Sequence, residues 1–192
     1  VGGGIQNGAL ASYATVGGGS QNKARGVHAT VGGGALNVAS GGYSFVGGGE
    51  SNIANNNHAA VVSGASNTSS GTASFIGTGW NNRASNADAA IVAGRHNIAS
   101  GAQSFVGGGD SDSATGASAT VGGGIQNHAS ANYSTVVGGS QNKARGTYAT
   151  VVGGVLNVAS GSHSFVGSGL SNIASGSYSV VGGGATNIAN NN

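Results

Sequence analysis

The stretch VGGGSQNKARGVHAT, residues 16–30, is the unit from which the whole chain is built. Divided every 15 residues from Val1, the 192 residues give twelve complete copies and a partial thirteenth, with no insertion between them. A strict period of this size is typical of solenoids, in which each repeat adds one turn and packs only on its neighbours. The sequence therefore predicts an all-β parallel β-solenoid of 15-residue rungs, forming a single repeat array over residues 1–192.

The repeat is easiest to follow by columns, numbered from 1 at each Val or Ile that starts a copy. Column 1 is β-branched in every copy, column 4 is always Gly, and column 14 is always Ala or Ser. Column 7 is Asn in every copy except one, where Asp112 replaces it. Because β-branched residues suit strands and Gly suits corners, we expect strands over columns 13 to 2 and 7 to 10. Corners are expected at columns 2–4 and at column 11, where Gly or Asn permits a positive φ or a close backbone approach.

The first strand is expected to have two buried faces. We place the small column 14 and the β-branched column 1 on opposite sides of it, which requires either a bulge or burial of both faces. We favour burial of both, one face inside the rung and the other against another subunit. On the second strand, Ala of column 9 is expected to face inward and the charged residues of columns 8 and 10 to face water.

Column 15 is never charged, and a file of Thr and Phe along the array is too apolar to stay exposed. We therefore predict that column 15 forms a subunit interface. The candidate interface residues are Thr15, Thr30, Phe45, Phe75, Phe105, Thr120, Thr135, Thr150 and Phe165.

The composition supports association and excludes several classes of function. One Val and two small side chains per rung make a thin core, and ordering 41 Gly residues is entropically unfavourable. Association into an oligomer is expected to supply the missing burial. With ten charged residues and a formal net charge of +2, electrostatic binding of nucleic acid is not expected. The absence of Cys excludes disulfides, thiol catalysis and zinc–thiolate sites.

The chain has no apolar run long enough for a transmembrane helix and no signal peptide, so we expect no membrane contact by this segment. It begins without Met and stops within a repeat, and we expect it to be a piece of something longer. Residues 16–30 and 136–150 agree at twelve of fifteen positions, which indicates that a block of eight rungs, 120 residues, was duplicated.

No set of residues points to catalysis, and we expect neither an enzyme nor a cofactor nor a bound metal. The Gly-rich turns could cradle phosphate, but a structural role is favoured because no helix pattern follows them. The Asn file of column 7 could bind a ligand, or could form a ladder between rungs that also caps the Gly turn; the ladder is favoured. Asp112 would then be a weak point or a small ion site, of which we favour the weak point.

Tyr and His share column 13, which predicts a stacked, partly exposed stripe. This stripe and two basic pairs are the candidate contact residues for a protein or a sugar. The favoured interpretation is stacking for the stripe and a solvated face for the basic pairs. They are Tyr13, His28, Tyr43, His58, Tyr133, Tyr148, His163, Tyr178, Lys23, Arg25, Lys143 and Arg145. Trp80, at a corner in column 5, is either a local wedge or a contact point.

The pattern SxVGGGxxNxASGxxS, as in residues 44–52 and 157–164, resembles the YadA-like head repeats of trimeric autotransporter adhesins. The resemblance covers the entire chain, although the constant period of 15 with extra Gly departs from the family's more frequent period of about fourteen. It implies a left-handed β-roll, a homotrimer, and exposure on a bacterial surface, with the outer-membrane anchor in parts outside this sequence.

The resemblance leads us to expect an extracellular head or fibre segment that attaches a bacterial cell to host, matrix or other surfaces. Extracellular matrix proteins and glycans are the candidate partners. The alternatives are a purely structural spacer of a surface or phage-type fibre and, ranked lower, an ice-binding or glycan-binding solenoid.

Overall fold

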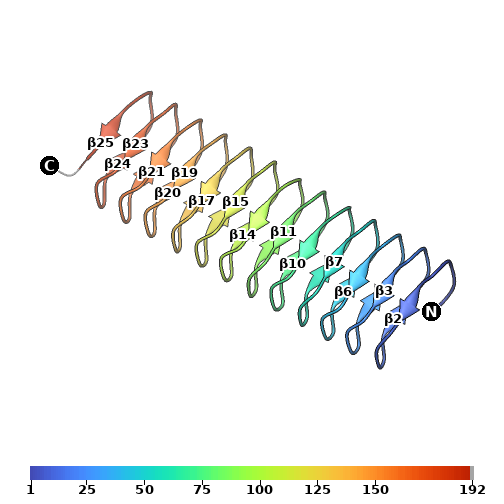
Figure 1. The fold of residues 1–192 in the computed structure, drawn as a ribbon. Coiled ribbons are helices and arrows are strands. Elements are labelled where there is room, and N and C mark those ends of the chain that lie inside the picture. Colours follow the sequence, from blue (N-terminus) through green and yellow to red (C-terminus); the bar gives the residue numbers. More distant parts are fainter. Residues whose placement is uncertain (191–192) are drawn as a thin grey trace. The chain divides into compact units, whose positions relative to one another are not determined.

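The computed structural model describes residues 1–190, and none of them is helical. The chain is an all-β parallel β-solenoid of about 12 turns with about 15 residues in each turn. It divides into two compact units, unit 1 (Val1–His96) and unit 2 (Asn97–Asn192), which are built in the same way (Figure 1). The predicted fold class and rung length are confirmed. Within the described residues, no helix is long and apolar enough to cross a membrane.

Each rung of unit 1 contributes one short strand to each of two parallel sheets. The first sheet contains β1 (Gly8–Ala9), β3 (Lys23–Ala24), β5 (Val38–Ala39), β7 (Ile53–Ala54), β9 (Thr68–Ser69) and β11 (Arg83–Ala84). The second contains β2 (Thr15–Val16), β4 (Thr30–Val31), β6 (Phe45–Val46), β8 (Ala60–Val61), β10 (Phe75–Ile76) and β12 (Ala90–Ile91).

Unit 2 repeats this arrangement. The odd-numbered strands are β13 (Ile98–Ala99), β15 (Ser113–Ala114), β17 (His128–Ala129), β19 (Lys143–Ala144), β21 (Val158–Ala159), β23 (Ile173–Ala174) and β25 (Ile188–Ala189). The even-numbered strands are β14 (Phe105–Val106), β16 (Thr120–Val121), β18 (Thr135–Val136), β20 (Thr150–Val151), β22 (Phe165–Val166) and β24 (Val180–Val181).

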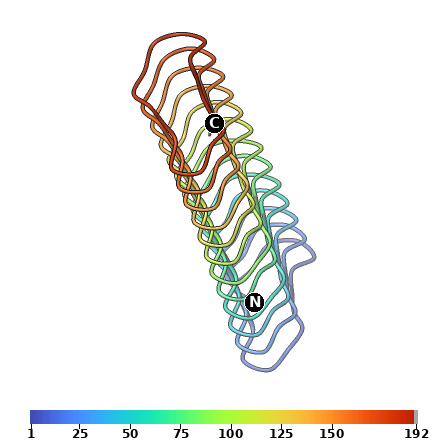
Figure 2. The ribbon, with the colours of Figure 1, turned by 90° about the vertical axis from the view of Figure 1, so that its left-hand side faces the viewer.

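Within each unit, every strand residue that pairs does so with the residue of the same column in the next rung. Phe45 pairs with Ala60 in unit 1, and Phe105 pairs with Thr120 in unit 2. Isolated parallel bridges at column 5, such as Ile5 to Ser20, form a third line of contact. Each rung is therefore a flattened loop held to the next rung at three places along its length (Figure 2). A property that recurs in one column becomes a continuous stripe on the unit.

The core is thin and is filled by columns 1, 7, 9 and 14. Val151 of column 1, Asn142 of column 7, and Ala144 and Ala149 of columns 9 and 14 are all fully buried. The expectation that columns 14 and 1 face opposite ways is wrong. Column 15 lies between them, so Ala149 and Val151 are two residues apart and point to the same side of the strand. No bulge is required, and only the outward face, column 15, is left for contact with another surface.

The strands are shorter than predicted, two residues each at columns 15–1 and 8–9 instead of four or five. Corners take up the remaining residues, because column 4, column 6 and column 13 all adopt positive φ, as at Gly139 (+89°), Gln141 (+58°) and Tyr148 (+58°). The expectation of a positive φ at column 11 is wrong, whereas the alternative of a close approach is right. A Cβ on Gly146 would collide with the carbonyl oxygen of Gly161 in the next rung.

The invariant Gly of column 4 is needed for both conformation and space, and we expect Gly139→Ala to lower the free energy of unfolding by about 2 kcal/mol. At φ +89° a Cβ on Gly139 would overlap the carbonyl oxygen of Gly154 and lie 2.6 Å from Nδ2 of Asn142. Gly138→Ala is the matched control, because a Cβ there would meet only the oxygen of Gly123, at 3.8 Å. Urea unfolding followed by circular dichroism measures both variants; equal midpoints would contradict the strict requirement at column 4.

Candidate interaction surfaces

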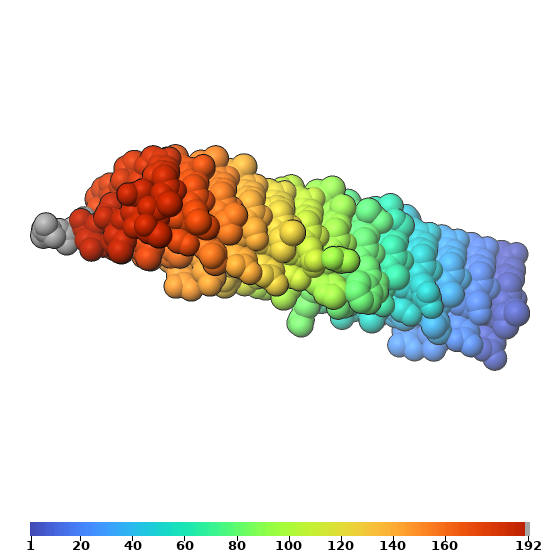
Figure 3. All heavy atoms as spheres, turned by 90° about the horizontal axis from the view of Figure 1, so that it is seen from above, coloured from blue at the N-terminus to red at the C-terminus, as the bar shows by residue number. Residues whose placement is uncertain are grey.

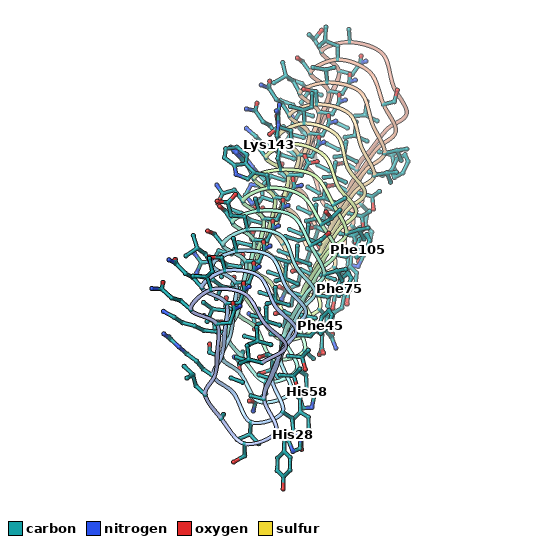
Figure 4. The ribbon with its side chains drawn as sticks, turned by 90° about the vertical axis from the view of Figure 1, so that its right-hand side faces the viewer. His28, Phe45, His58, Phe75, Phe105 and Lys143 are labelled. Carbon is teal, nitrogen blue, oxygen red and sulfur yellow. The ribbon has the colours of Figure 1, made fainter. Side chains whose placement is uncertain are left out.

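The outer surface of the even-numbered strands is an apolar face, which we call the Thr/Phe face: column 15 together with column 2. In unit 1 it carries Phe45 and Phe75, exposed by 40% and 38%, and the exposed Val62 and Val92. In unit 2 it carries Phe105 and Phe165, the exposed Val137, Val152 and Val180, and the threonines of column 15. The structure therefore places all the candidate interface residues on one outward face in each unit. Figure 4 shows Phe45 and Phe75 along one side of unit 1.

Each Phe ring of this face lies over a glycine two residues further on. The Cε1 atom of Phe45 is 3.3 Å from the position that a Cβ would take on Gly47. The corresponding distance is 3.5 Å for Phe75 over Gly77, and the same value recurs for Phe105 over Gly107 and Phe165 over Gly167. The rings thus lie along the sheet instead of standing up from it.

At each step along the face, at most one of its two columns carries a Phe or Val side chain. The valines of column 2 follow small residues of column 15: Ala60, Ala90, Thr135 and Thr150 precede Val62, Val92, Val137 and Val152. A Phe in column 15 is always followed two residues later by Gly in column 2, never by Val, because the ring occupies the space that a Val side chain would need. This exchange prevents two large side chains from meeting on the face; where Thr15, Thr30 and Thr120 precede Gly in column 2, the face carries Thr alone.

The aromatic residues of column 13 form one stack in each unit. In unit 1 the ring centroids of Tyr13, His28, Tyr43 and His58 follow one another at 4.6, 4.7 and 5.3 Å, with interplanar angles of 3–8°. In unit 2 the stack comprises Tyr133, Tyr148, His163 and Tyr178, at 4.8 to 4.9 Å. The rings within each stack use their faces on one another, so they offer mainly their edges, the Tyr hydroxyls and the His nitrogens to a partner. Figure 4 shows His28 and His58 together at one corner of the roll.

The basic candidates lie on the opposite sheet from the Thr/Phe face. Lys143 is half-buried on β19 and Arg145 is exposed just after it, while Ala144 between them is buried. Figure 4 shows Lys143 and Phe105 projecting from opposite sides of unit 2. Lys23 and Arg25 have the same arrangement in unit 1. The expected alternation of columns 8, 9 and 10 is therefore observed.

His128 joins the basic pair of unit 2, because β17 pairs with β19 and sets His128 beside Lys143. Burial lowers the pKa of His128, and the charges of Arg145 and Lys143 lower it further. Both effects disfavour the charged form of His128. Its Nε2 atom lies 3.2 Å from the hydroxyl of Thr115.

The Asn residues of column 7 form a ladder between rungs, as the favoured interpretation of the sequence predicts. Nδ2 of Asn142 donates to the carbonyl oxygens of Gly138 (2.9 Å) and Gly154 (2.8 Å), and its Oδ1 accepts the backbone N–H of Asn157 (3.0 Å). One side chain thereby caps its own Gly corner and binds the next rung twice. These bonds use both Nδ2 donors and the Oδ1 acceptor, so the ladder is structural and offers nothing to a ligand.

No pocket opens among residues 1–190, and the face seen in Figure 3 is not hollowed. Within the same residues, no three His, Asp or Glu side chains come close enough to hold a metal ion. The surfaces available for contact are therefore the Thr/Phe face, the two ring stacks and the basic pairs.

Two features escaped sequence reasoning. The coupling of Phe at column 15 to Gly at column 2 is visible when the two columns are compared copy by copy. Trp80 is not alone at its corner, because His96 of the next rung lies with its ring centroid 4.5 Å away, tilted by 52°. Since His96 is in column 6 and Trp80 in column 5, a comparison within one column could not reveal this pair.

Comparison with known proteins adds no assignment: no family model matches the chain, and no match to a curated protein was found.

Proposed function

We propose that the chain is an extracellular adhesin-type segment that associates into a homotrimer of left-handed β-rolls and attaches a bacterial surface to matrix proteins or glycans. The trimer, the handedness and the location follow from the resemblance of the repeats to YadA-like heads. The observation that carries the proposal is the Thr/Phe face, which recurs in both units and leaves large apolar side chains in water on a single chain.

Association through this face leaves other stripes free for contact. The edges of the ring stacks and the guanidinium groups of Arg25 and Arg145 lie outside the Thr/Phe face. Tyr and Arg are enriched among residues that dominate binding energy. In the trimer each stack is present three times, so weak individual contacts add up by multivalency.

A structural spacer is the second candidate, and the ring stacks favour it. Rings that stack face to face within the chain stiffen the corner and offer less surface to a sugar than free rings do. In that case the segment extends a fibre whose binding site is elsewhere.

Binding of the purified chain to immobilised matrix proteins and glycans separates the two functions. An adhesin is expected to bind saturably, and Tyr43→Ser with Tyr148→Ser is expected to weaken the binding at least about tenfold, the loss of roughly 1.4 kcal/mol. Trp80→Ser is the matched control, because Trp80 is a half-exposed aromatic outside both stacks. Absence of binding to every surface by a correctly assembled chain would contradict adhesion and favour the spacer.

A further inference from the structure

The ladder of unit 2 contains one residue that cannot make the bonds of its neighbours. Asp112 occupies column 7, is fully buried, and accepts the backbone N–H of Asn127 at Oδ1 (2.7 Å) as an Asn would. Its second oxygen, Oδ2, is buried and has no hydrogen-bond partner.

The surroundings of Oδ2 are known from the other rungs. Asn127 donates from Nδ2 to the oxygens of Gly123 (3.0 Å) and Gly139 (2.9 Å), in its own rung and the next. The side-chain atom that a Cβ built on the column 4 glycine would meet supports the match: it is Nδ2 of Asn127 at Gly124 and Oδ2 of Asp112 at Gly109. Oδ2 thus stands where an amide nitrogen belongs, toward the carbonyls of Gly108 and Gly124.

An ionised carboxylate only accepts hydrogen bonds, so at this place it would face carbonyl oxygens that also only accept. Burying a charged carboxylate with one oxygen left without a donor is unfavourable. A proton on Oδ2 restores the missing donor. We propose that Asp112 is a neutral carboxylic acid in the folded rung, with its O–H directed at the carbonyl of Gly108 or Gly124, and that losing this proton weakens the ladder of unit 2.

The electrostatic surroundings act in the same direction. Burial raises the pKa of Asp112 above its usual value, the hydrogen bonds from Asn127 lower it, and the charge of Asp110 on the same corner raises it. Of the strands packed around Asp112, β17 carries a titratable side chain, His128, whose pKa is lowered. The strands β13, β14, β15 and β16 carry none.

The raised pKa of Asp112 determines how the stability of the chain depends on pH. A folded-state pKa above the unfolded value near 3.9 means that the folded chain holds more protons than the unfolded chain between the two values. Stability therefore rises as the pH falls through the folded pKa and levels off below the unfolded pKa. This is opposite to the behaviour of a carboxylate that is stabilised in its charged form.

Urea unfolding of the unmodified chain and of Asp112→Asn, between about pH 4 and pH 8, tests the proposal. Asp112→Asn restores the residue found in the other twelve copies, so it is expected to fold. At pH 8 its unfolding midpoint is expected to exceed that of the unmodified chain, and the difference is expected to shrink as the pH falls. The ratio of the two unfolding constants should change by up to about tenfold per pH unit within the window.

Asn127→Asp places a second carboxyl group in the ladder and is expected to add a second pH-dependent loss of stability. Asp110→Asn removes the neighbouring acid and is expected to leave most of the dependence in place. In carbon-13 spectra, the carboxyl of Asp112 is expected to titrate above the usual range of an Asp side chain. A parallel pH profile for the unmodified chain and Asp112→Asn would overturn the proposal. So would a midpoint at pH 8 that added sodium or calcium chloride raises in the unmodified chain but not in Asp112→Asn, because the oxygen would then hold a cation.

Discussion

A chain carrying Phe45→Asp and Phe105→Asp together is expected to sediment as a monomer under conditions in which the unmodified chain sediments as a trimer. Each substitution places a carboxylate on the Thr/Phe face, where an opposing subunit would have to bury it without a partner. A buried unpaired charge costs several kcal/mol, and a symmetric trimer would contain each of the two changes three times. Sedimentation equilibrium gives the mass directly.

The matched control is Ile53→Asp with Ile98→Asp, one change in each unit on the outer side of the opposite sheet. In unit 2, Ile98 is exposed by 41% and Phe105 by 38%, so these two positions begin from similar exposure; in unit 1, Ile53 is half-buried and Phe45 is exposed by 40%. The control is expected to remain trimeric. A trimer that survives the Phe changes, or that dissociates only with the Ile changes, would remove the interface from the Thr/Phe face.

The second large effect is expected at the ladder, where Asn142→Ala should lower the free energy of unfolding by about 3 kcal/mol or more. The change removes both donors to the oxygens of Gly138 and Gly154 and the acceptor of the Asn157 N–H; Asn142 is fully buried, and the two glycines are half-buried. Each buried group left without a partner costs about 1–3 kcal/mol. Chemical unfolding measures the loss.

Asn7→Ala tests whether burial makes the difference. Asn7 makes the same two donor bonds, to the oxygens of Gly3 and Gly19 at 2.7 Å, but in an exposed setting. Water can replace those bonds, so the loss is expected to be well under half of that for Asn142→Ala. Equal losses at the two positions would contradict the account of the ladder.

The sequence alone predicted the architecture because its periodicity is strict. An unbroken 15-residue repeat with β-branched residues at Val1, Val16 and onward leaves few arrangements other than stacked rungs, and the inward Ala of column 9 follows from alternation. The ladder was predictable too, since Asn at one position per turn can bond both along the stack and to its own corner.

What the sequence could not reveal is where the corners turn. Tyr and Gln adopt positive φ at columns 13 and 6, as Tyr148 and Gln141 do, and these residue types carry no strong preference for that conformation. The corner conformation shortens the strands and leaves column 15 as the one outward residue of each even-numbered strand. The error over columns 14 and 1 came from the assignment of faces, and the burial of Ala149 and Val151 corrects it.

The mass of the unmodified chain in solution tests the central claim most directly, namely that thin rungs are completed by neighbouring chains across the Thr/Phe face. The account predicts a single species of three times 18.0 kDa in sedimentation equilibrium. A folded species of 18.0 kDa that persists at high protein concentration, with Phe45 and Phe105 in water, would contradict it.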